Sequence, residues 1–246
     1  MCTVTIIRTP SGVRMACNRD EQRSRPPAEP PRARSFAGVR TVMPIDPISG
    51  GTWIGVNEHG LALTLLNRND EQYPARGERS RGEVIPLLID ASSIDEVERR
   101  LAELEGLQFG PFRLVAVDAE GQGVIWANRP AIGRDRIWKA HDLPVCFTSS
   151  SLGDALVDLP RLELFAEWFA DEASRTPAHQ DAFHAHRWPE HPELSVNMSR
   201  DDAESVSSTA VEIEEHTATL TYHGGPPGLG VEPVTCELHR ADVERV

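Results

Sequence analysis

The sequence predicts a single layered α+β domain over residues 1–246, with two sheets covered by helices on their outer faces. Most of the predicted strands follow one another as hairpins, too close in sequence for the crossover helices of a parallel sheet. Several strands are apolar at nearly every position, so both of their faces are expected to be covered. No linker rich in Pro, Gly or Ser separates two cores.

The N-terminal third is predicted to form two hairpins. Strands rich in Thr, Val and Ile are expected at 2–7 and 13–17, and a second pair at 52–56 and 61–66 flanks a turn that ends in glycine. The run 22–34 between the hairpins is rich in proline and arginine. Because proline suits neither the interior of a strand nor that of a helix, we expect an irregular surface segment there.

Helices are predicted in the middle of the chain. Ser80 and Glu83 have the spacing of a capping box at the start of one helix, and a second begins near Ser93 with apolar residues at helical spacing. The run 159–172 predicts a strongly amphipathic helix, and the polar run 173–203 predicts helix fragments and loop. Further strands are expected at 112–118, 123–128, 136–139, 145–148, 207–213, 217–222 and 235–239.

Composition excludes several classes of function. The formal charge of −13 opposes binding to nucleic acid or to an anionic membrane surface. No run approaches the roughly 20 apolar residues that cross a bilayer. The four cysteines form no CxxC pair, and the N-terminus lacks the pattern of a secretory signal, which together favour the reduced cytoplasm. The oligomeric state is not determined by these features.

Cys2 is the residue with the clearest chemical potential. Removal of Met1 would leave a cysteine that carries both a thiol nucleophile and a free α-amine, whose reference pKa of about 7.7 to 8 suits a general base. From its position alone, an ordinary strand residue is the simpler interpretation of Cys2, and the catalytic interpretation needs further support from the sequence. Four histidines lie between His179 and His191, but they lack the companions of a zinc site, so we expect a solvated loop, no metal and no cofactor.

Three stretches of sequence together resemble the NRDE family, the group that includes transport and Golgi organization protein 2. They are MCT at the start, CNRDE at 17–21 and GGTWIGVNEHGLALTLLN at 50–67. Shorter matches at 80–82, 111–112 and 207–209 extend the resemblance over most of the chain. The family is related to the N-terminal nucleophile hydrolases of the cholylglycine hydrolase and penicillin acylase branch, which implies a four-layer αββα sandwich.

The resemblance also implies roles for individual residues. Cys2 would be the nucleophile, Asp20 would hold the α-amino group, and Asn67 would donate to the oxyanion. Arg19 would lower the thiol pKa or bind a substrate carboxylate. Because neighbouring residues of a strand lie on opposite faces, either Arg19 or Asp20 is expected to face away from the site, and Asn18, which shares strand parity with Asp20, is a reserve candidate.

The sequence departs from the hydrolase pattern in two places. Ser149 and Ser150 stand where related hydrolases have an asparagine after a threonine, and they are candidate substrate-binding residues. The late arginine of those enzymes has no clear match, with Arg161 and Arg200 as candidates.

Two functions follow from the resemblance. The first is an amidohydrolase that cleaves a non-peptide C–N bond, or a thioester, of a small acyl substrate without a cofactor. The second is a non-catalytic carrier of haem, acyl-coenzyme A or lipid on the same fold, in which Cys2 is a ligand or a structural residue. A structural interaction protein is a third, weaker alternative, because the matched motifs are typical of a small-molecule site.

Overall fold

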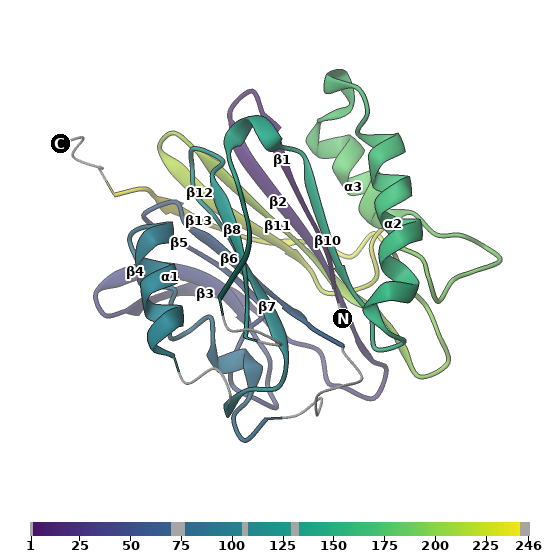
Figure 1. Ribbon diagram of the computed structural model, residues 1–246, viewed down its shortest axis with the longest axis horizontal. Coiled ribbons are helices and arrows are strands. Elements are labelled where there is room, and N and C mark those ends of the chain that lie inside the picture. Colours follow the sequence, from purple (N-terminus) through teal and green to yellow (C-terminus); the bar gives the residue numbers. More distant parts are fainter. Residues whose placement is uncertain (1, 70–76, 105–107, 129–132, 242–246) are drawn as a thin grey trace.

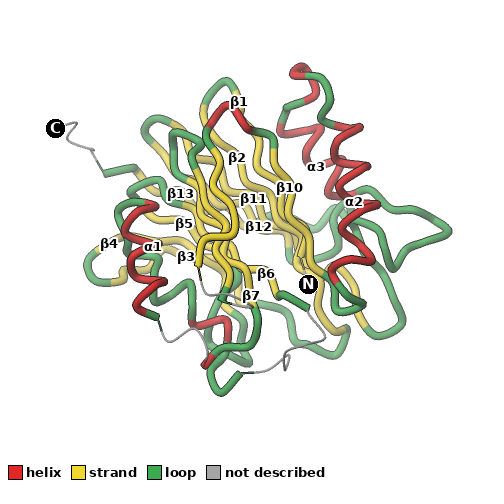
Figure 2. Tube along the Cα trace, in the orientation of Figure 1, coloured by secondary structure: helices red, strands yellow, loops and turns green. Residues whose placement is uncertain are grey.

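Two antiparallel sheets stack face to face, with helices outside both of them (Figure 1 and Figure 2). The structure, a computed structural model, describes residues 2–69, 77–104, 108–128 and 133–241. Within these residues one sheet has six strands, in the spatial order β10 (Val145–Ser149), β1 (Cys2–Thr9), β2 (Gly12–Gln22), β11 (Ala203–Glu214), β12 (Thr217–His223) and β13 (Val234–His239). The other has seven, in the order β3 (Glu29–Phe36), β4 (Val39–Ile45), β5 (Ile54–Asn57), β6 (Ala62–Asn67), β7 (Phe112–Val117), β8 (Gly123–Ala127) and β9 (Gly133–Trp138).

The helices complete the four layers. Helix α1 (Ile94–Glu103) packs on β7 and β8 of the seven-stranded sheet, whereas α2 (Asp154–Trp168) and α3 (Pro177–Ala185) cover β10, β1 and β2 of the other sheet. Short 3-10 helices lie at Arg81–Glu83, Ala140–Asp142 and Glu172–Ser174. This is the predicted αββα sandwich. No helix in the described part of the chain is long and apolar enough to span a membrane.

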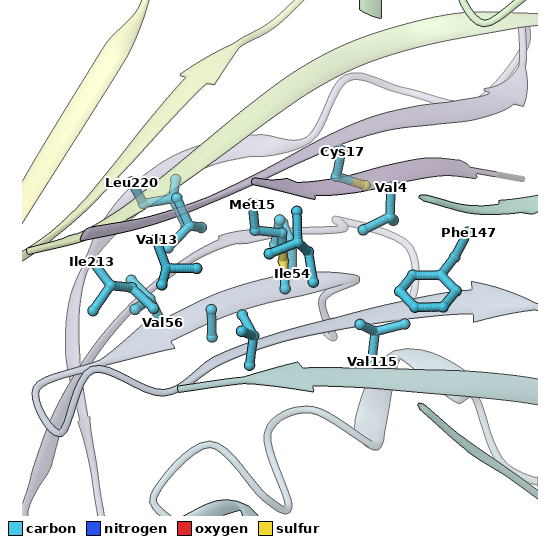
Figure 3. Close-up of a cluster of buried hydrophobic side chains, with 14 of the residues drawn as sticks. Val4, Val13, Met15, Cys17, Ile54, Val56, Val115, Phe147, Ile213 and Leu220 are labelled. Atoms are coloured by element: carbon cyan, nitrogen blue, oxygen red, sulfur yellow. The ribbon is translucent and has the colours of Figure 1, made fainter. Parts of the chain in front are cut away.

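The main hydrophobic core lies between the two sheets. Figure 3 shows side chains of β2, among them Val13 and Met15, pointing toward Ile54 and Val56 of β5 on the facing sheet. Two further clusters lie under the helices. One joins α1 to the outer face of the seven-stranded sheet, and the other joins α2 and α3 to the six-stranded sheet. Both faces of the central strands are therefore buried, which explains why these strands are apolar at successive positions.

The first predicted hairpin is confirmed and is longer than predicted. Strands β1 and β2 pair from Cys2 opposite Arg19 to Thr9 opposite Gly12, and β2 continues to Gln22. The polar residues after Cys17 stay in the strand because β11 pairs with β2 along its whole length. Tertiary pairing thus overrides the polar character of the sequence at this point.

The prediction of an irregular segment over 22–34 is wrong in its second half. Glu29–Phe36 forms β3, which pairs with β4, a strand that the sequence analysis did not predict. Pro30 and Pro31 are accommodated because β3 is the edge strand of its sheet, and the register shifts between Glu29 and Arg32.

The predicted helix after Ser80 is also wrong in its extent. The capping box is present, with Ser80 accepting from the Gly82 amide and Glu83 accepting from the Ser80 amide, but only the three-residue 3-10 helix follows. The residues that were expected to form one helical face instead lie in turns, and Val84 and Leu88 are buried there under the sheet. The helix predicted from Ser93 is confirmed as α1, capped by the Ser93 side chain.

The core predicts a measurable contrast between two isoleucines. Ile54 is fully buried between the sheets, whereas Ile137 on β9 is 56% exposed. We expect Ile54→Ala to lower the free energy of unfolding by about 2–5 kcal/mol, because it leaves a cavity. The matched change Ile137→Ala should alter it by less than about 0.5 kcal/mol. Urea denaturation followed by circular dichroism measures both, and equal losses would contradict the assignment of the core.

Candidate active site

Cys2 lies at the start of β1, between two neighbouring strands. It pairs with Arg19 on β2 and with Ser149 on β10. Its backbone nitrogen donates to the Ser149 hydroxyl oxygen over 3.0 Å, and its Sγ lies 4.0 Å from the carbonyl oxygen of Leu65 on β6. The thiol therefore lies between the two sheets, and Cys2 as a residue is 4% exposed.

A second thiol changes the acidity of Cys2. Cys17 lies diagonally across from Cys2 on β2, since Cys17 pairs with Val4, and both cysteines belong to the core between the sheets. A hydrogen bond from Cys17 lowers the pKa of the Cys2 thiol and outweighs the opposing effect of burial. The same hydrogen bond and burial raise the pKa of Cys17 well above its ordinary value, so Cys17 stays a protonated donor. Of this pair, Cys2 is the thiol that ionises first.

A pocket of about 590 Å³ opens beside Cys2. Its wall brings together four of the residues singled out in the sequence, namely Cys2, Arg19, Asp20 and Asn67. Residues of the loop between β4 and β5 and of the segment 77–82 also line it. A volume of this size is typical of a site for a small molecule.

Asp20 is buried next to the end of β2. Its Oδ1 accepts a hydrogen bond from the Ser205 hydroxyl over 2.6 Å. Burial raises the pKa of Asp20, and the cation of Arg161 opposes that rise. Arg161 comes from the buried face of α2 and donates to the Thr3 hydroxyl, so a helix residue supplies positive charge close to the start of β1.

Both Arg19 and Asp20 line the pocket, although strand parity predicted that one of them would point away. Arg19 lies on the same face as Cys2. Asp20 lines the pocket near the end of the strand, where a β-bulge between Ser205 and Ser207 of β11 interrupts the regular pairing with β2.

Asn67 is the last residue of β6 and is half-buried in the pocket wall. It stands two residues after Leu65, so by strand parity the two side chains share the face of β6 that turns toward the cluster under α1. Asn67 nevertheless lines the pocket, because it is the last residue of the strand. Among the described residues its amide has no hydrogen-bond partner. Within this described part of the chain, an unpaired side-chain N–H therefore lies in the same pocket wall as Cys2.

An ion-pair network holds Arg19 in place. Its Nη2 donates to Asp46 Oδ2 over 2.6 Å, and its guanidinium lies 4.4 Å from the centre of the Trp53 ring. Arg25 donates to both carboxylate oxygens of Asp46. Burial raises the pKa of Asp46, but the hydrogen bond from Arg25 brings it below its ordinary value. Glu21 also pairs with Arg19 and Arg25, over 3.4 and 3.5 Å.

Asn18 is not brought to this pocket. Its amide donates to the carbonyl oxygens of His184 and Val196, and its Oδ1 contacts His184 Nδ1, all on the face of the sheet that α3 covers. The expectation of a solvated histidine loop is wrong for His184, which lies in α3 and is buried against Thr5. Burial lowers the pKa of His184 to about 3, so this imidazole is neutral at physiological pH.

Ser149 and Ser150 are not among the described residues that line the pocket. The Ser149 hydroxyl instead holds the backbone nitrogen of Cys2. The backbone nitrogen of Ser150 donates to Asp154 at the start of α2, and its hydroxyl accepts from the Leu152 amide. Ser149 is thus placed to orient Cys2, and Ser150 belongs to the turn before α2.

Several residues of the pocket were missed by the sequence analysis. Asp46, Trp53 and Arg81 all contribute to its wall. Arg81 and Trp53 stand within stretches that resemble the family and could have been found from them, whereas nothing in the local sequence distinguishes Asp46. Ser205, which binds Asp20, is far away in sequence, and only the register of β11 on β2 brings the two together.

Comparisons with known proteins agree with the fold. Residues 1–220 match the family described as Transport and Golgi organisation 2. No curated protein sequence matches the chain. Two variants of the conjugated bile acid hydrolase from Clostridium perfringens each superpose on this chain with a TM-score of 0.55. The first is 10% identical and aligns over 97% of this chain and 92% of its own. The second is 11% identical and aligns over 100% of both chains. The N-acylethanolamine-hydrolyzing acid amidase ortholog of Caenorhabditis elegans has a TM-score of 0.52 at 11% identity, over 85% of this chain and 92% of its own.

The thiol pair predicts how substitution of Cys17 alters the reactivity of Cys2. In Cys17→Ala the hydrogen bond that lowers the pKa of Cys2 is lost, so its alkylation by iodoacetamide should shift to higher pH. Below the pKa, the rate falls about tenfold for each unit by which the pKa rises. Cys17→Ser keeps a donor of similar size and should retain most of the rate. Peptide mass spectrometry over a range of pH measures the labelling, and identical profiles for the alanine variant and the wild type would contradict the role of Cys17.

Proposed function

Because this chain belongs to the Transport and Golgi organisation 2 family and has the sandwich of the N-terminal nucleophile hydrolases, we propose that it is a hydrolase of small acyl compounds. The bond that it cleaves is a non-peptide amide C–N bond or a thioester. One observation carries this proposal: a thiol of lowered pKa, Cys2, lies in the wall of a pocket of about 590 Å³ together with Asn67, whose amide has no hydrogen-bond partner among the residues that the structure describes.

The reaction begins with removal of Met1, which converts the backbone nitrogen of Cys2 into an α-amine. The amine accepts the thiol proton, and Sγ attacks the carbonyl carbon of the substrate to give a tetrahedral oxyanion. Asn67 donates an N–H to this oxyanion, which appears only as the bond forms, so the interaction stabilises the transition state more than the substrate. The ammonium then protonates the leaving nitrogen as the C–N bond breaks.

The second half of the reaction releases the acyl group. A water molecule gives a proton to the amine and attacks the Cys2 thioester, and the acid leaves as the thiol is restored. Asp20 would orient the amine, and two observations support this role: Cys2 is paired with Arg19, the residue before Asp20, and Asp20 lines the same pocket. Arg19 supports the thiolate through its positive charge, while Asp46 and Trp53 keep its guanidinium in a fixed position. No step needs a cofactor.

The proposal predicts selective acylation of Cys2. Incubation with an acyl β-lactam should add one acyl group to a protein whose intact mass lacks Met1, and Cys2→Ser should remove this adduct. Cys146→Ser should leave it unchanged, because burial raises the pKa of Cys146 to about 12 and makes it a poor nucleophile.

A form that retains Met1 serves as the control for the amine. It keeps the thiol but lacks the base at residue 2, so we expect no turnover of amides or thioesters. The hydrolase proposal would be overturned if Cys2 of wild-type protein without Met1 were acylated no faster than an ordinary thiol. In that case, titration with haem or acyl-coenzyme A would be the test of the carrier function.

Asn67 should contribute to the rate more than to binding. On a substrate that the wild type turns over, Asn67→Ala is expected to lower kcat by about 10²–10³ with little change in KM, because the lost donor acts on the oxyanion. Asn69→Ala is a matched control, since Asn69 bonds to Asp154 and does not line the pocket. A kcat for Asn67→Ala within about twofold of the wild type would exclude this role.

A further inference from the structure

Arg81 occupies a rigid position in the pocket wall. The capping box between Ser80 and Glu83 fixes the backbone on both sides of it. The Thr52 amide donates to the Gly82 carbonyl oxygen over 3.0 Å, and Gly51 approaches Gly82 so closely that a Cβ at Gly51 would lie 2.2 Å from that oxygen. The segment that carries Arg81 is therefore held against the loop before β5.

Arg81 differs from the other arginines of the pocket, because each of the others is paired with a carboxylate. Arg19 and Arg25 both bind Asp46, and Arg79 binds Glu83 over 2.7 Å. Arg81 donates from Nη1 to the Pro111 carbonyl oxygen over 3.1 Å, and it forms no ion pair with any residue in the described part of the chain.

The surroundings of Arg81 favour a bound anion. Arg81 is half-buried, so its charge is partly removed from water, and this burial lowers the pKa of its guanidinium. The charges of Glu21 and Cys2 only partly offset this effect. Glu21 itself lies within ion-pair distance of Arg19 and Arg25 instead. A half-buried cation without a direct counter-ion is costly, and a carboxylate that fits the planar fork of an arginine would remove that cost.

We propose that Arg81 binds a carboxylate of the substrate, so that the site selects acyl compounds that carry a carboxylate in addition to the bond that is cleaved. Arg81 and Cys2 line the same pocket, and its volume of about 590 Å³ accommodates a small molecule that reaches both. The inference rests on the proposed hydrolase for the identity of the cleaved bond. The anion site itself depends only on the geometry of Arg81.

Binding to a protein that cannot react tests the site directly. The probes are glutaryl 4-nitroanilide and its methyl ester, which differ only in the charge of the carboxyl group, and calorimetry on Cys2→Ser measures both dissociation constants. We expect the acid to bind about tenfold to a hundredfold more tightly than the ester, as for a hydrogen-bonded charge pair. Adding Arg81→Gln should remove this preference, and Arg81→Lys should restore part of it.

Arg79→Gln is the matched control, because Arg79 lines the same wall but is already paired with Glu83. It should keep the preference for the acid, and thermal melting should show that all variants are folded. Three results would each overturn the inference. They are equal affinity of Cys2→Ser for the acid and the ester, no binding of the acid, and a preference for the acid that persists when Arg81→Gln is added.

Release of 4-nitroaniline by protein with an intact Cys2 separates the two proposals. Wild-type protein that binds the acid through Arg81 but neither releases nitroaniline nor forms an acyl adduct would refute the hydrolase and leave the anion site in place. The opposite result is turnover in which kcat/KM is the same for the acid and the ester, both in the wild type and in Arg81→Gln. That result would support the hydrolase and refute the anion site.

Discussion

The site depends on the position of β1 between β2 and β10. A single residue at the start of this strand is paired on both sides, so Cys2 has Arg19 on one side and Ser149 on the other. The facing sheet then brings the Leu65 carbonyl oxygen to the same thiol and Asn67 to the wall of the same pocket. A nucleophile fixed by backbone pairing on both sides loses little conformational freedom during a reaction, which is the physical advantage of building it into the centre of a sheet.

Burial of charge is the second constraint on this site. Arg19, Asp46 and Arg161 are each more than nine-tenths buried, and every one of them has hydrogen-bond partners. Because the low dielectric of the interior strengthens electrostatic interactions, small displacements of these groups would change the acidity of Cys2 and Asp20. The Asp46 network, the Trp53 ring and the α2 helix therefore act on the pocket by keeping charges at fixed distances from it.

The parts of the fold that could be predicted from sequence are those determined by local pattern. The first hairpin, α1 and the strands of the central sheets follow from apolar runs, capping and turns. The edge strand β3 was missed because its prolines suggest a loop, and only the sheet edge makes them acceptable. Of the site, the resemblance pointed to Cys2, Asp20 and Asn67, which the structure brings to one pocket. The direction of Asn18 could not be predicted, because it depends on α3, which lies more than 150 residues further along the chain.

The proline-bearing edge strand has a consequence for how separate copies of this protein behave. An exposed strand edge offers free N–H and C=O groups on which another chain could form an additional strand. Pro30 and Pro31 lack N–H donors, and Arg32 and Arg34 add charge along the same strand. The β3 edge of the seven-stranded sheet is thus a poor template for intermolecular strand addition, and the sandwich is protected there against growth into fibres.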